Sequence, residues 1–464
     1  MLVNYSFKNF RSYYDLQEFS MAAKSYNDNE QNLQEIDNSI ATKSNKLLKS
    51  ALLLGCNGAG KSNFVASLGY LAYLIKQSYV NFQNNKQTSF FASEKFKFIE
   101  EAKNEPTCFN IEFIANDNNN YCYELELDID KDIPFVKKEI LSKRVNNGKN
   151  RLAFSQCIFH RDLDEIIEGE SSIMSLFNFI KPQKEFLLLS YLFTSNLNDN
   201  IVELISPVKY WFNNLSIIEA DNEIIIDLNL ITEKDLDFVT KIISAYTKPL
   251  SKIIKSSNQL DIMPEELRTP QVAINTLNKK YPNGLPGVIT ILQNGVFAQD
   301  LIGVFNIFNS NGECTGDFKY SIFDTSSRIL SKGEKKIIFL MLYIKQALNK
   351  GSVILIDEME TSLHKNVCEL IVDMFNDKDV NKNKAQAIFT TQNINMIDYN
   401  FRKDQVFLIR KSQDCGKSNI SSLSQISKTE KVIRKDVKLS KIFEKEIEGT
   451  TSPINLKLIK TILK

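Results

Sequence analysis

The chain has 464 residues, which suits two to three domain-sized units on a scale of about 150 residues each. Its 43% hydrophobic and 24% charged residues are typical of a globular protein, its net charge of +1 excludes a polycation, and it has no apolar run of about 18 residues that would predict a membrane span. Seven scattered Cys, only two His and no signal-peptide pattern predict a cytoplasmic protein without a His-rich metal site.

The first informative element is a Gly-rich loop at residues 55–62, which reads GCNGAGKS. The apolar run 51–54 precedes it, and a helical pattern follows from Asn63 to about Lys76. A strand, a G-x-x-x-x-G-K-S loop and a helix in this order form a phosphate-binding loop, in which backbone N–H groups and the helix N-terminus bind phosphate oxygens. We expect Lys61 to reach the β- and γ-phosphates and the Ser62 hydroxyl to bind Mg²⁺.

Residues 95–140 alternate apolar and polar side chains, as half-buried strands do. Two segments, 109–113 and 121–128, show the pattern, and the Asn-rich residues 116–120 between them predict a hairpin turn. We therefore expect an antiparallel β-subdomain here. From 142 to 320 the pattern becomes largely helical and polar, with a Pro/Gly break at 281–287 and no sustained heptads, so we predict an inserted, mainly helical lobe.

Residues 330–334, LSKGE, precede an apolar run at 337–344. Ser331 and Glu334 have the spacing of a capping box, which predicts a helix start. The same helix end, with Gly333, can also offer N–H groups and a hydroxyl to a phosphate.

Residues 352–358, SVILIDE, predict a buried strand that ends in two carboxylates. Alone, this pattern also fits a strand that ends at a solvated acidic turn. With a phosphate loop in the same chain, we expect Asp357 to hold Mg²⁺ and Glu358 to orient or deprotonate the attacking water.

The last third predicts further core strands at 353–356, 387–391 and 406–409. From residue 401 to 464 there are fifteen Lys/Arg against seven Asp/Glu, with clusters such as Arg410-Lys411 and Arg434-Lys435. A basic surface of this kind can track a phosphate backbone, so nucleic-acid binding stays open. A Lys-rich solvated surface explains the counts equally well.

Together these motifs resemble an ATP-binding-cassette (ABC) ATPase of the SMC and RecF branch, and within it the overcoming-lysogenization-defect (OLD) proteins and related stand-alone phage-defence ATPases. The resemblance implies an α/β fold: a P-loop head with a mixed, mostly parallel sheet and an antiparallel β-subdomain. It divides the chain into 1–141, an inserted lobe at 142–320, and 321–464. The segments that carry it are FKNFRS at 7–12, the loop 55–63, LSKGE at 330–334, DEMETSLH at 357–364 and TTQN at 390–393.

The resemblance implies a set of site residues. The first strand of such heads runs close to the nucleotide, which assigns Arg11 to the nucleotide site, and the signature of one protomer closes over the nucleotide of the other. The implied nucleotide-binding residues are Arg11, Asn57, Gly58, Ala59, Gly60, Lys61, Ser62 and Asn63; the metal ligands are Ser62 and Asp357; the signature residues acting in trans are Ser331, Gly333 and Glu334; and the catalytic residues are Glu358, Lys61 and Gln392.

One position departs from the pattern. Gln392 stands where this superfamily usually has a His. Both side chains can donate a hydrogen bond to the γ-phosphate, but only His can also carry charge. We therefore expect a slow ATPase.

Three functions remain open from sequence. The leading one is an ATPase with Mg²⁺ that forms a homodimer or higher homo-oligomer on ATP and controls a separate effector protein, a nuclease or toxin, in anti-phage defence. The second is a RecF-like DNA-repair or recombination ATPase, and the third, a transporter subunit, is disfavoured by the insertion of about 180 residues. The D-x-D pairs Asp128/Asp130 and Asp162/Asp164 are weak candidates for nuclease ligands, since they lie upstream, in a hairpin edge and in an acidic helix or loop.

Overall fold

The computed structural model describes residues 1–24, 38–42, 46–84, 94–130, 133–146, 152–179, 183–220, 231–246, 249–260, 288–292, 295–322, 331–412 and 414–425. The chain forms two compact units. The first contains Met1–Asn222 and Ala347–Lys464, and the second contains Glu223–Gln346. Each unit is described by itself. No described helix is long and apolar enough to cross a membrane.

The first unit is built on a six-stranded sheet in the order β11-β16-β17-β5-β18-β19. Neighbours from β11 to β18 are parallel, and β19 pairs antiparallel with β18. Every residue of β5, β16 and β17 is buried, as expected of parallel strands covered on both faces, and this explains the apolar stretches LLL, VILI and AIF within them. The strands are β5 (Ser50–Leu54), β11 (Ser216–Ile218), β16 (Val353–Ile356), β17 (Gln386–Thr391), β18 (Val406–Lys411) and β19 (Ser418–Ser422).

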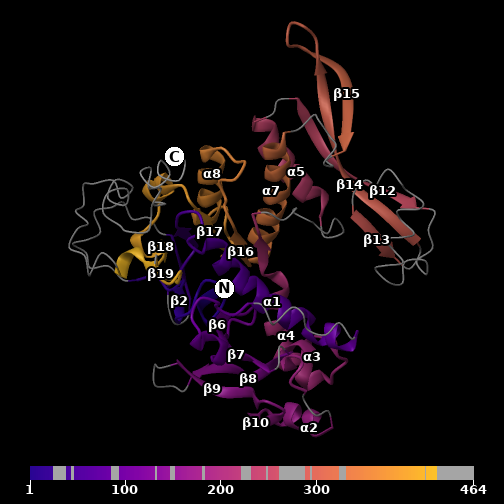
Figure 1. Ribbon diagram of the computed structural model, residues 1–464. Helices are drawn as coiled ribbons and strands as arrows, with labels where there is room; N and C mark the ends of the chain where they lie inside the picture. Colours follow the sequence, from indigo (N-terminus) through magenta and orange to yellow (C-terminus); the bar gives the residue numbers. More distant parts are fainter. Residues whose placement is uncertain are drawn as a thin grey trace, which may run out of the picture. The chain divides into compact units, whose positions relative to one another are not determined.

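Two helices lie on opposite sides of β16 and β17: α1 (Lys61–Gln83) and α8 (Lys365–Asn376) (Figure 1). The helix predicted to end near Lys76 extends seven residues further. Short 3-10 turns η5 (Ile394–Asp398) and η6 (Lys403–Gln405) connect β17 to β18. The strands predicted at 353–356, 387–391 and 406–409 are confirmed.

A second, antiparallel sheet of seven strands has the order β10-β9-β8-β7-β6-β1-β2. Its predicted hairpin is confirmed: Phe109 pairs with Leu125, and the turn closes with the Ala115 N–H donating to the Asn119 carbonyl at 3.1 Å. The strands are β1 (Leu2–Lys8), β2 (Gln17–Ser20), β6 (Thr107–Ile114), β7 (Asn120–Asp130), β8 (Ile133–Asn146), β9 (Leu152–Asp162) and β10 (Glu165–Gly169). A two-stranded sheet, β3 (Ser39–Ala41) with β4 (Lys46–Leu48), and the 3-10 turn η2 (Glu101–Asn104) complete this part.

The core of the first unit is rich in aromatic side chains that join α1 to the antiparallel sheet. The single tryptophan, Trp211, stacks on Phe113 with ring centroids 4.5 Å apart, and Tyr79 of α1 meets Phe186 edge-on at 4.9 Å. Trp211 lies on one of three helices between β10 and β11: α2 (Ser171–Phe179), α3 (Leu188–Thr194) and α4 (Asp199–Asn214).

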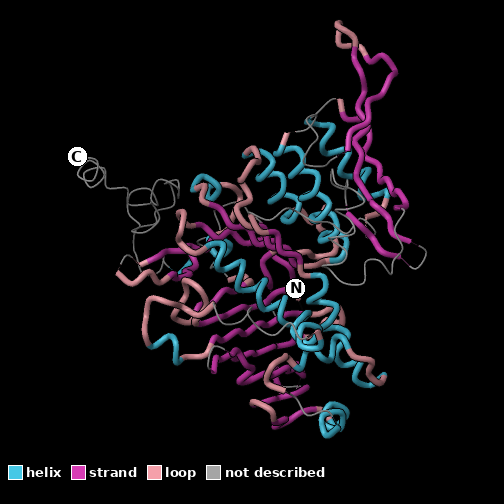
Figure 2. The backbone as a smooth tube through the Cα atoms, turned by 45° about the vertical axis from the view of Figure 1, so that its right-hand side comes forward, coloured by secondary structure: helices cyan, strands magenta, loops and turns pink. Residues whose placement is uncertain are grey.

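The described residues of the second unit form two helices and a four-stranded antiparallel sheet (Figure 2). Its elements are α5 (Glu233–Tyr246), β12 (Leu250–Leu260), β13 (Val288–Leu292), β14 (Gly295–Phe308), β15 (Cys314–Ile322) and α7 (Lys332–Lys350), the last of which continues into the first unit. The end of β14 and most of β15 form an arm, residues 307–320, in which every residue is exposed. The arm holds four of the eleven exposed large hydrophobic side chains: Ile307, Phe308, Phe318 and Tyr320.

The predicted division at 142 and 320 is wrong in two respects. Position 142 falls inside β8, and β9 and β10 continue the same sheet, so the compact insertion starts near residue 223. In the part of the insertion that the structure describes, β12 to β15 account for more residues than α5 and α7 do, so this part is not mainly helical. Strand patterns are present in this segment, since β13 reads VITIL and Phe318 and Tyr320 of β15 alternate with polar residues, but they are short and were outweighed by the polar, helix-like residues around them. The break at 281–287 lies outside the described residues.

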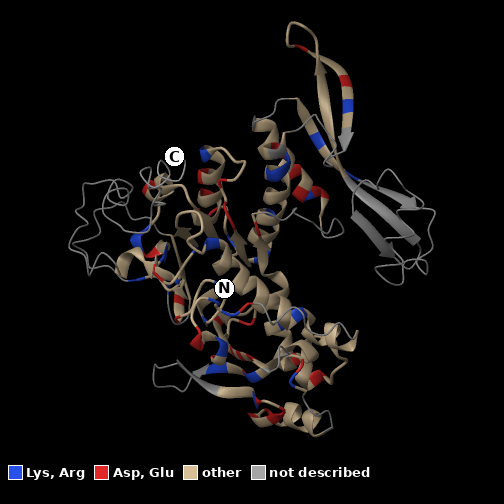
Figure 3. Ribbon diagram, viewed as in Figure 1, with Lys and Arg blue, Asp and Glu red and all other residues tan. Residues whose placement is uncertain are grey.

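Lys/Arg and Asp/Glu are interspersed along the described elements (Figure 3). The basic region predicted from residue 401 onward is described only to residue 425, apart from residue 413. The cluster Arg434-Lys435 lies outside the described residues.

Candidate functional site

The phosphate loop lies at the carboxyl edge of the parallel sheet, between β5 and α1. The loop turns at Gly58 and Gly60, whose φ values of 76° and 120° lie in the region that side-chain-bearing residues rarely adopt. A Cβ at Gly60 would also lie 2.6 Å from the Ser418 hydroxyl and 3.0 Å from that of Ser12. The spacing of glycines in the sequence therefore meets a backbone requirement of the loop.

The first turn of α1 presents backbone N–H groups at the carboxyl edge of the sheet, and no side chain caps them. Gly60 is the N-cap residue. Backbone N–H groups at a helix start that lack a cap are available to an anion. Ser62 is exposed, and Asn63 donates from its Nδ2 to the Ser12 hydroxyl at 2.8 Å.

Lys61 is buried, with 3% of its surface exposed. Its ammonium donates to the carbonyls of Gly55 at 2.9 Å and Cys56 at 3.1 Å, so it is held across the loop. No carboxylate of the described residues forms an ion pair with it. A buried cation needs a counter-charge, and here only neutral carbonyls surround it, which is the arrangement that favours binding an anion.

The two acids follow β16 at the same edge of the sheet. Asp357 is 2% exposed, and its backbone N–H donates to the Ile218 carbonyl at 2.8 Å. Glu358 has φ 44°, a left-handed conformation that is costly for a residue with a side chain and often marks a functional site. Its carboxylate accepts a hydrogen bond from the Thr361 hydroxyl at 3.1 Å.

Thr390, at the end of β17, holds both acids in place. Its hydroxyl donates to Asp357 Oδ1 in a short hydrogen bond and accepts the backbone N–H of Glu358 at 2.8 Å. Gln392, predicted to stand at the switch position two residues after Thr390, has an exposed side chain, and its backbone N–H donates to Glu360 Oε1 at 2.8 Å. Since β16, β17 and β5 are parallel neighbours, the acids, the switch and the phosphate loop all follow the carboxyl ends of adjacent strands.

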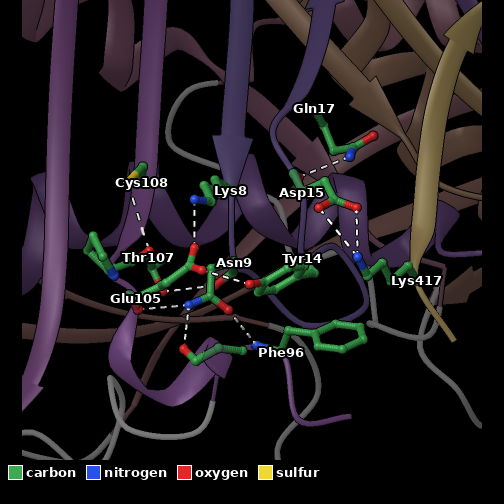
Figure 4. A network of polar contacts seen from close by, with 12 residues as sticks. Lys8, Asn9, Tyr14, Asp15, Gln17, Phe96, Glu105, Thr107, Cys108 and Lys417 are labelled. Atoms are coloured by element: carbon green, nitrogen blue, oxygen red, sulfur yellow. Dashed lines mark hydrogen bonds and ion pairs between the residues drawn. The ribbon is translucent and has the colours of Figure 1, made fainter. Parts of the chain in front are cut away.

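The turn that follows β1 carries Arg11 and is stabilised by buried Asn9. Both residues have positive φ, 54° for Asn9 and 48° for Arg11, so the turn is strained. Asn9 Nδ2 donates to the carbonyls of Ala102 and Glu105, both at 2.8 Å, and its Oδ1 accepts the Phe96 N–H at 3.1 Å (Figure 4). These contacts fix a conformation that the local sequence would not hold alone.

Glu105 ties the flanks of the same turn together. Its carboxylate accepts from Lys8 Nζ at 2.6 Å and from the Tyr14 hydroxyl at 2.7 Å (Figure 4). These two hydrogen bonds lower the pKa of Glu105 below its ordinary value. Lys417 lies over the Tyr14 ring, 4.5 Å from its centroid, and pairs with Asp15 at 3.2 Å, so β19 is joined to this network.

Arg11 pairs with Glu94. Its Nη2 donates to Glu94 Oε1 at 3.1 Å, and its Nε makes a short hydrogen bond to Oε2. The backbone N–H of Arg11 donates to the backbone carbonyl of Glu94 at 2.5 Å. The Glu94 hydrogen bonds raise the pKa of Arg11 above its ordinary value. No local pattern in the sequence predicts Glu94 as this partner.

Two serines and a tyrosine that sequence reasoning missed brace the phosphate loop. The Ser418 hydroxyl donates to the Ala59 carbonyl at 2.6 Å, and its oxygen lies 2.9 Å from the Ser12 hydroxyl oxygen. The Tyr13 hydroxyl donates to the Gly60 carbonyl at 3.0 Å, and burial raises its pKa far above its ordinary value. Ser12 is the last residue of the FKNFRS motif, though no role was assigned to it, and Tyr13 follows it directly, whereas Ser418 lies more than 350 residues from the loop and had no nearby signal.

The predicted signature residues belong to the other unit, at the start of α7. The capping box is confirmed: the Glu334 N–H donates to the Ser331 hydroxyl at 3.2 Å, and Glu334 Oε2 accepts the Ser331 N–H at 2.8 Å. Ser331 is exposed and Gly333 half-buried. Leu330 lies outside the described residues.

The donor set at the loop fits Mg²⁺. Ser62 offers an exposed hydroxyl, and Thr390 occupies only one oxygen of Asp357, which leaves the other for a ligand. Hard oxygen donors, few in number and completed by phosphate oxygens and water, are what Mg²⁺ binds in nucleotide sites.

The D-x-D pairs do not form a metal site with other residues. Asp128 Oδ1 accepts from Lys95 Nζ at 2.8 Å, and Asp162 lies 3.3 Å from His160 Nε2 at the turn between β9 and β10. Over the described ranges, no group of three or more His, Cys, Asp or Glu is placed to hold a metal ion.

Comparison with known families gives one match, which covers residues 50–398 and so includes the phosphate loop, the two acids and the switch. The family is AAA_21, described as "AAA domain, putative AbiEii toxin, Type IV TA system". The chain belongs to this family. AAA_21 is a family of P-loop ATPase-like domains, which is consistent with the loop and acids described above.

No curated protein matches the chain. Among solved structures, one match is the crystal structure of an SMC head bound to the C-winged helix domain of ScpA. The sequence identity is 14%, the match covers 92% of this chain and 99% of that one, and the TM-score is 0.36.

Proposed function

We propose that this AAA_21 protein is an ATPase of the ABC type, most similar to OLD-like heads, that binds ATP with Mg²⁺ and hydrolyses it slowly. The observation that carries the proposal is the buried Lys61 ammonium, which has carbonyl partners and no described carboxylate. A triphosphate supplies the missing counter-charge, and the uncapped first turn of α1 adds N–H donors.

In this proposal each residue at the carboxyl edge of the parallel sheet has its own role in binding or hydrolysis. Lys61 and the loop amides bind the β- and γ-phosphates, and Ser62 with Asp357 holds Mg²⁺, which neutralises phosphate charge when bound. Glu358 orients the attacking water and accepts its proton. Gln392 donates to the γ-phosphate from the end of the neighbouring strand.

The first test is Lys61→Ala. The variant should lose tight ATP binding, because no other side chain of the loop brings a positive charge to the phosphates. Lys76→Ala, on the same helix, is the matched control and should bind ATP as the unmodified protein does. Calorimetric titration with ATP and Mg²⁺ measures both, and an unchanged affinity in Lys61→Ala would overturn the proposal.

We further propose that ATP joins two copies of the chain, with Ser331, Gly333 and Glu334 of one copy closing on the nucleotide of the other. The supporting observation is the exposed, capped start of α7, which presents Ser331 to solvent. Glu358→Gln should trap the closed dimer, because the carboxylate that handles the water is removed while the phosphate contacts stay. Light scattering after size exclusion should then give a larger mass with ATP than without; equal masses would contradict the dimer.

The output of the cycle is proposed to be control of a separate effector, a nuclease or toxin, in anti-phage defence, in line with the toxin–antitoxin description of the family. The proposed contact site is the arm at 307–320 of the insertion, and its aromatic side chains Phe318, 50% exposed, and Tyr320, 64% exposed, support this. Co-purification of the protein with the product of its neighbouring gene, with and without Phe318→Ser, tests it.

A second candidate is a RecF-like ATPase that acts on DNA. The fifteen basic residues against seven acidic ones after position 400 favour this DNA-binding candidate. Salt-dependent binding of a labelled duplex and stimulation of ATP turnover by DNA would support this alternative, and the absence of both would exclude it.

A further inference from the structure

Glu360, two residues beyond Glu358, has a carboxylate at the candidate site of which one oxygen accepts a hydrogen bond and the other does not. Its Oε1 accepts the backbone N–H of Gln392 at 2.8 Å. Its Oε2 is buried, and no donor from the described residues reaches it. A buried carboxylate oxygen normally has a partner, so an orphaned one in a native structure asks for an explanation.

The contact spans the two segments on which hydrolysis depends. Glu358 and Glu360 lie on the turn after β16, and Gln392 follows β17. Two further hydrogen bonds join the same segments: Met359 N–H to the Thr390 carbonyl at 3.1 Å, and Glu358 N–H to the Thr390 hydroxyl at 2.8 Å. Both of these hydrogen bonds end at Thr390. Among the contacts of the described residues, the bond from the Gln392 N–H to Glu360 is the one that joins the turn after β16 to Gln392 itself.

We propose that Glu360 is a positioning residue that fixes the main chain of Gln392 relative to Glu358. In this proposal its Oε2 accepts a hydrogen bond from a donor that comes within reach when nucleotide binds at the carboxyl edge of the parallel sheet. The proposal rests on the proposed ATPase function. It follows from the geometry that Glu360 acts on the hydrolytic step through Gln392 and not on the affinity for ATP, because its carboxylate contacts neither the phosphate loop nor Lys61 in the described structure.

The test compares Glu360→Ala with Glu360→Gln. Alanine removes the acceptor for the Gln392 N–H, whereas glutamine keeps an oxygen at that place. We expect Glu360→Ala to lower kcat about tenfold or more while the calorimetric Kd for ATP stays within about twofold, and Glu360→Gln to restore part of the turnover. Glu369→Ala, on the surface of α8, is the matched control and should keep full turnover.

A double-variant cycle separates positioning from a general structural effect. If Glu360 acts through Gln392, the losses in Glu360→Ala and Gln392→Ala should not multiply in the double variant. Multiplying losses, or an unchanged kcat in Glu360→Ala, would overturn the proposal.

Hydrogen exchange provides a readout that does not depend on activity. The Gln392 amide should exchange faster in Glu360→Ala than in the unmodified protein, and near the unmodified rate in Glu360→Gln. Equal exchange in all three proteins would overturn the positioning role even if the protein proved not to hydrolyse ATP. Absent turnover in the unmodified protein, with the exchange difference present, would instead contradict the ATPase proposal alone.

Discussion

Thr390 illustrates what single residues contribute to this site. Its hydroxyl is shared between the Asp357 carboxylate and the Glu358 N–H, and this pair of bonds supports the left-handed backbone of Glu358. In the sequence, Thr390 is a β-branched residue at the end of an apolar run, which is the ordinary signal of a strand. Its partners are more than 30 residues away, so only the pairing of β16 with β17 reveals its role.

Gln392 allows a prediction about the rate. A glutamine can only donate a hydrogen bond to the γ-phosphate, whereas histidine can also become cationic and stabilise the charge that develops in the transition state. We expect Gln392→His to leave ATP binding unchanged and to raise kcat about tenfold, equivalent to about 1.4 kcal/mol. Steady-state phosphate release measures the change. Unchanged or lower turnover would mean that this position does not limit the reaction.

At the scale of elements, burial decided which strands could be predicted. The strands β5, β16 and β17 are covered on both faces and contain the apolar stretches LLL, VILI and AIF, while β6 and β7 alternate as half-buried strands do. The strand β13 reads as a short apolar run, VITIL, and in β15 Phe318 and Tyr320 alternate with polar residues, but the prediction of a mainly helical lobe passed over both patterns. The hydrogen bonds around Asn9 and Glu105 were also beyond sequence reasoning, because they join a turn near residue 10 to residues nearly 100 positions later.

The network around Glu105 predicts a pH dependence of stability. Its folded-state pKa is lower than the ordinary value, so the carboxylate stabilises the fold above that value, and the contribution disappears as the pH falls through the lowered pKa. We expect Glu105→Gln to lower the urea midpoint at about pH 7 and to differ less from the unmodified protein at about pH 3. Glu100→Gln, an exposed acid five residues earlier, is the control; a Glu105→Gln difference that does not shrink with acid would refute the linkage.

For the whole molecule, the sequence predicted that the phosphate loop, the two acids and Gln392 lie at one edge of the sheet better than it predicted where the insertion begins and ends. Loop, acids and switch each follow an apolar strand, and parallel strands bring their carboxyl ends to one edge, so their grouping follows from the pattern. The limits of the insertion were wrong because β9 and β10 extend a sheet begun far upstream, and the polarity of a strand does not identify the sheet it joins. Long-range supports such as Ser418 and Glu94 had no local signal.

The distribution of acids over the molecule leads to the last prediction: the purified chain should hydrolyse ATP with Mg²⁺ but should not cut DNA or RNA. A metal-dependent nuclease needs several converging ligands, whereas Asp128 is paired with Lys95 and Asp162 lies at an exposed turn, and the described residues hold no cluster of three ligands. Incubation of plasmid DNA and of RNA with the protein, ATP and Mg²⁺ or Mn²⁺ measures cleavage, with phosphate release from the same samples as the positive control. Cleavage that Asp128→Ala or Asp162→Ala abolishes would make the protein a self-contained nuclease and remove the need for a separate effector.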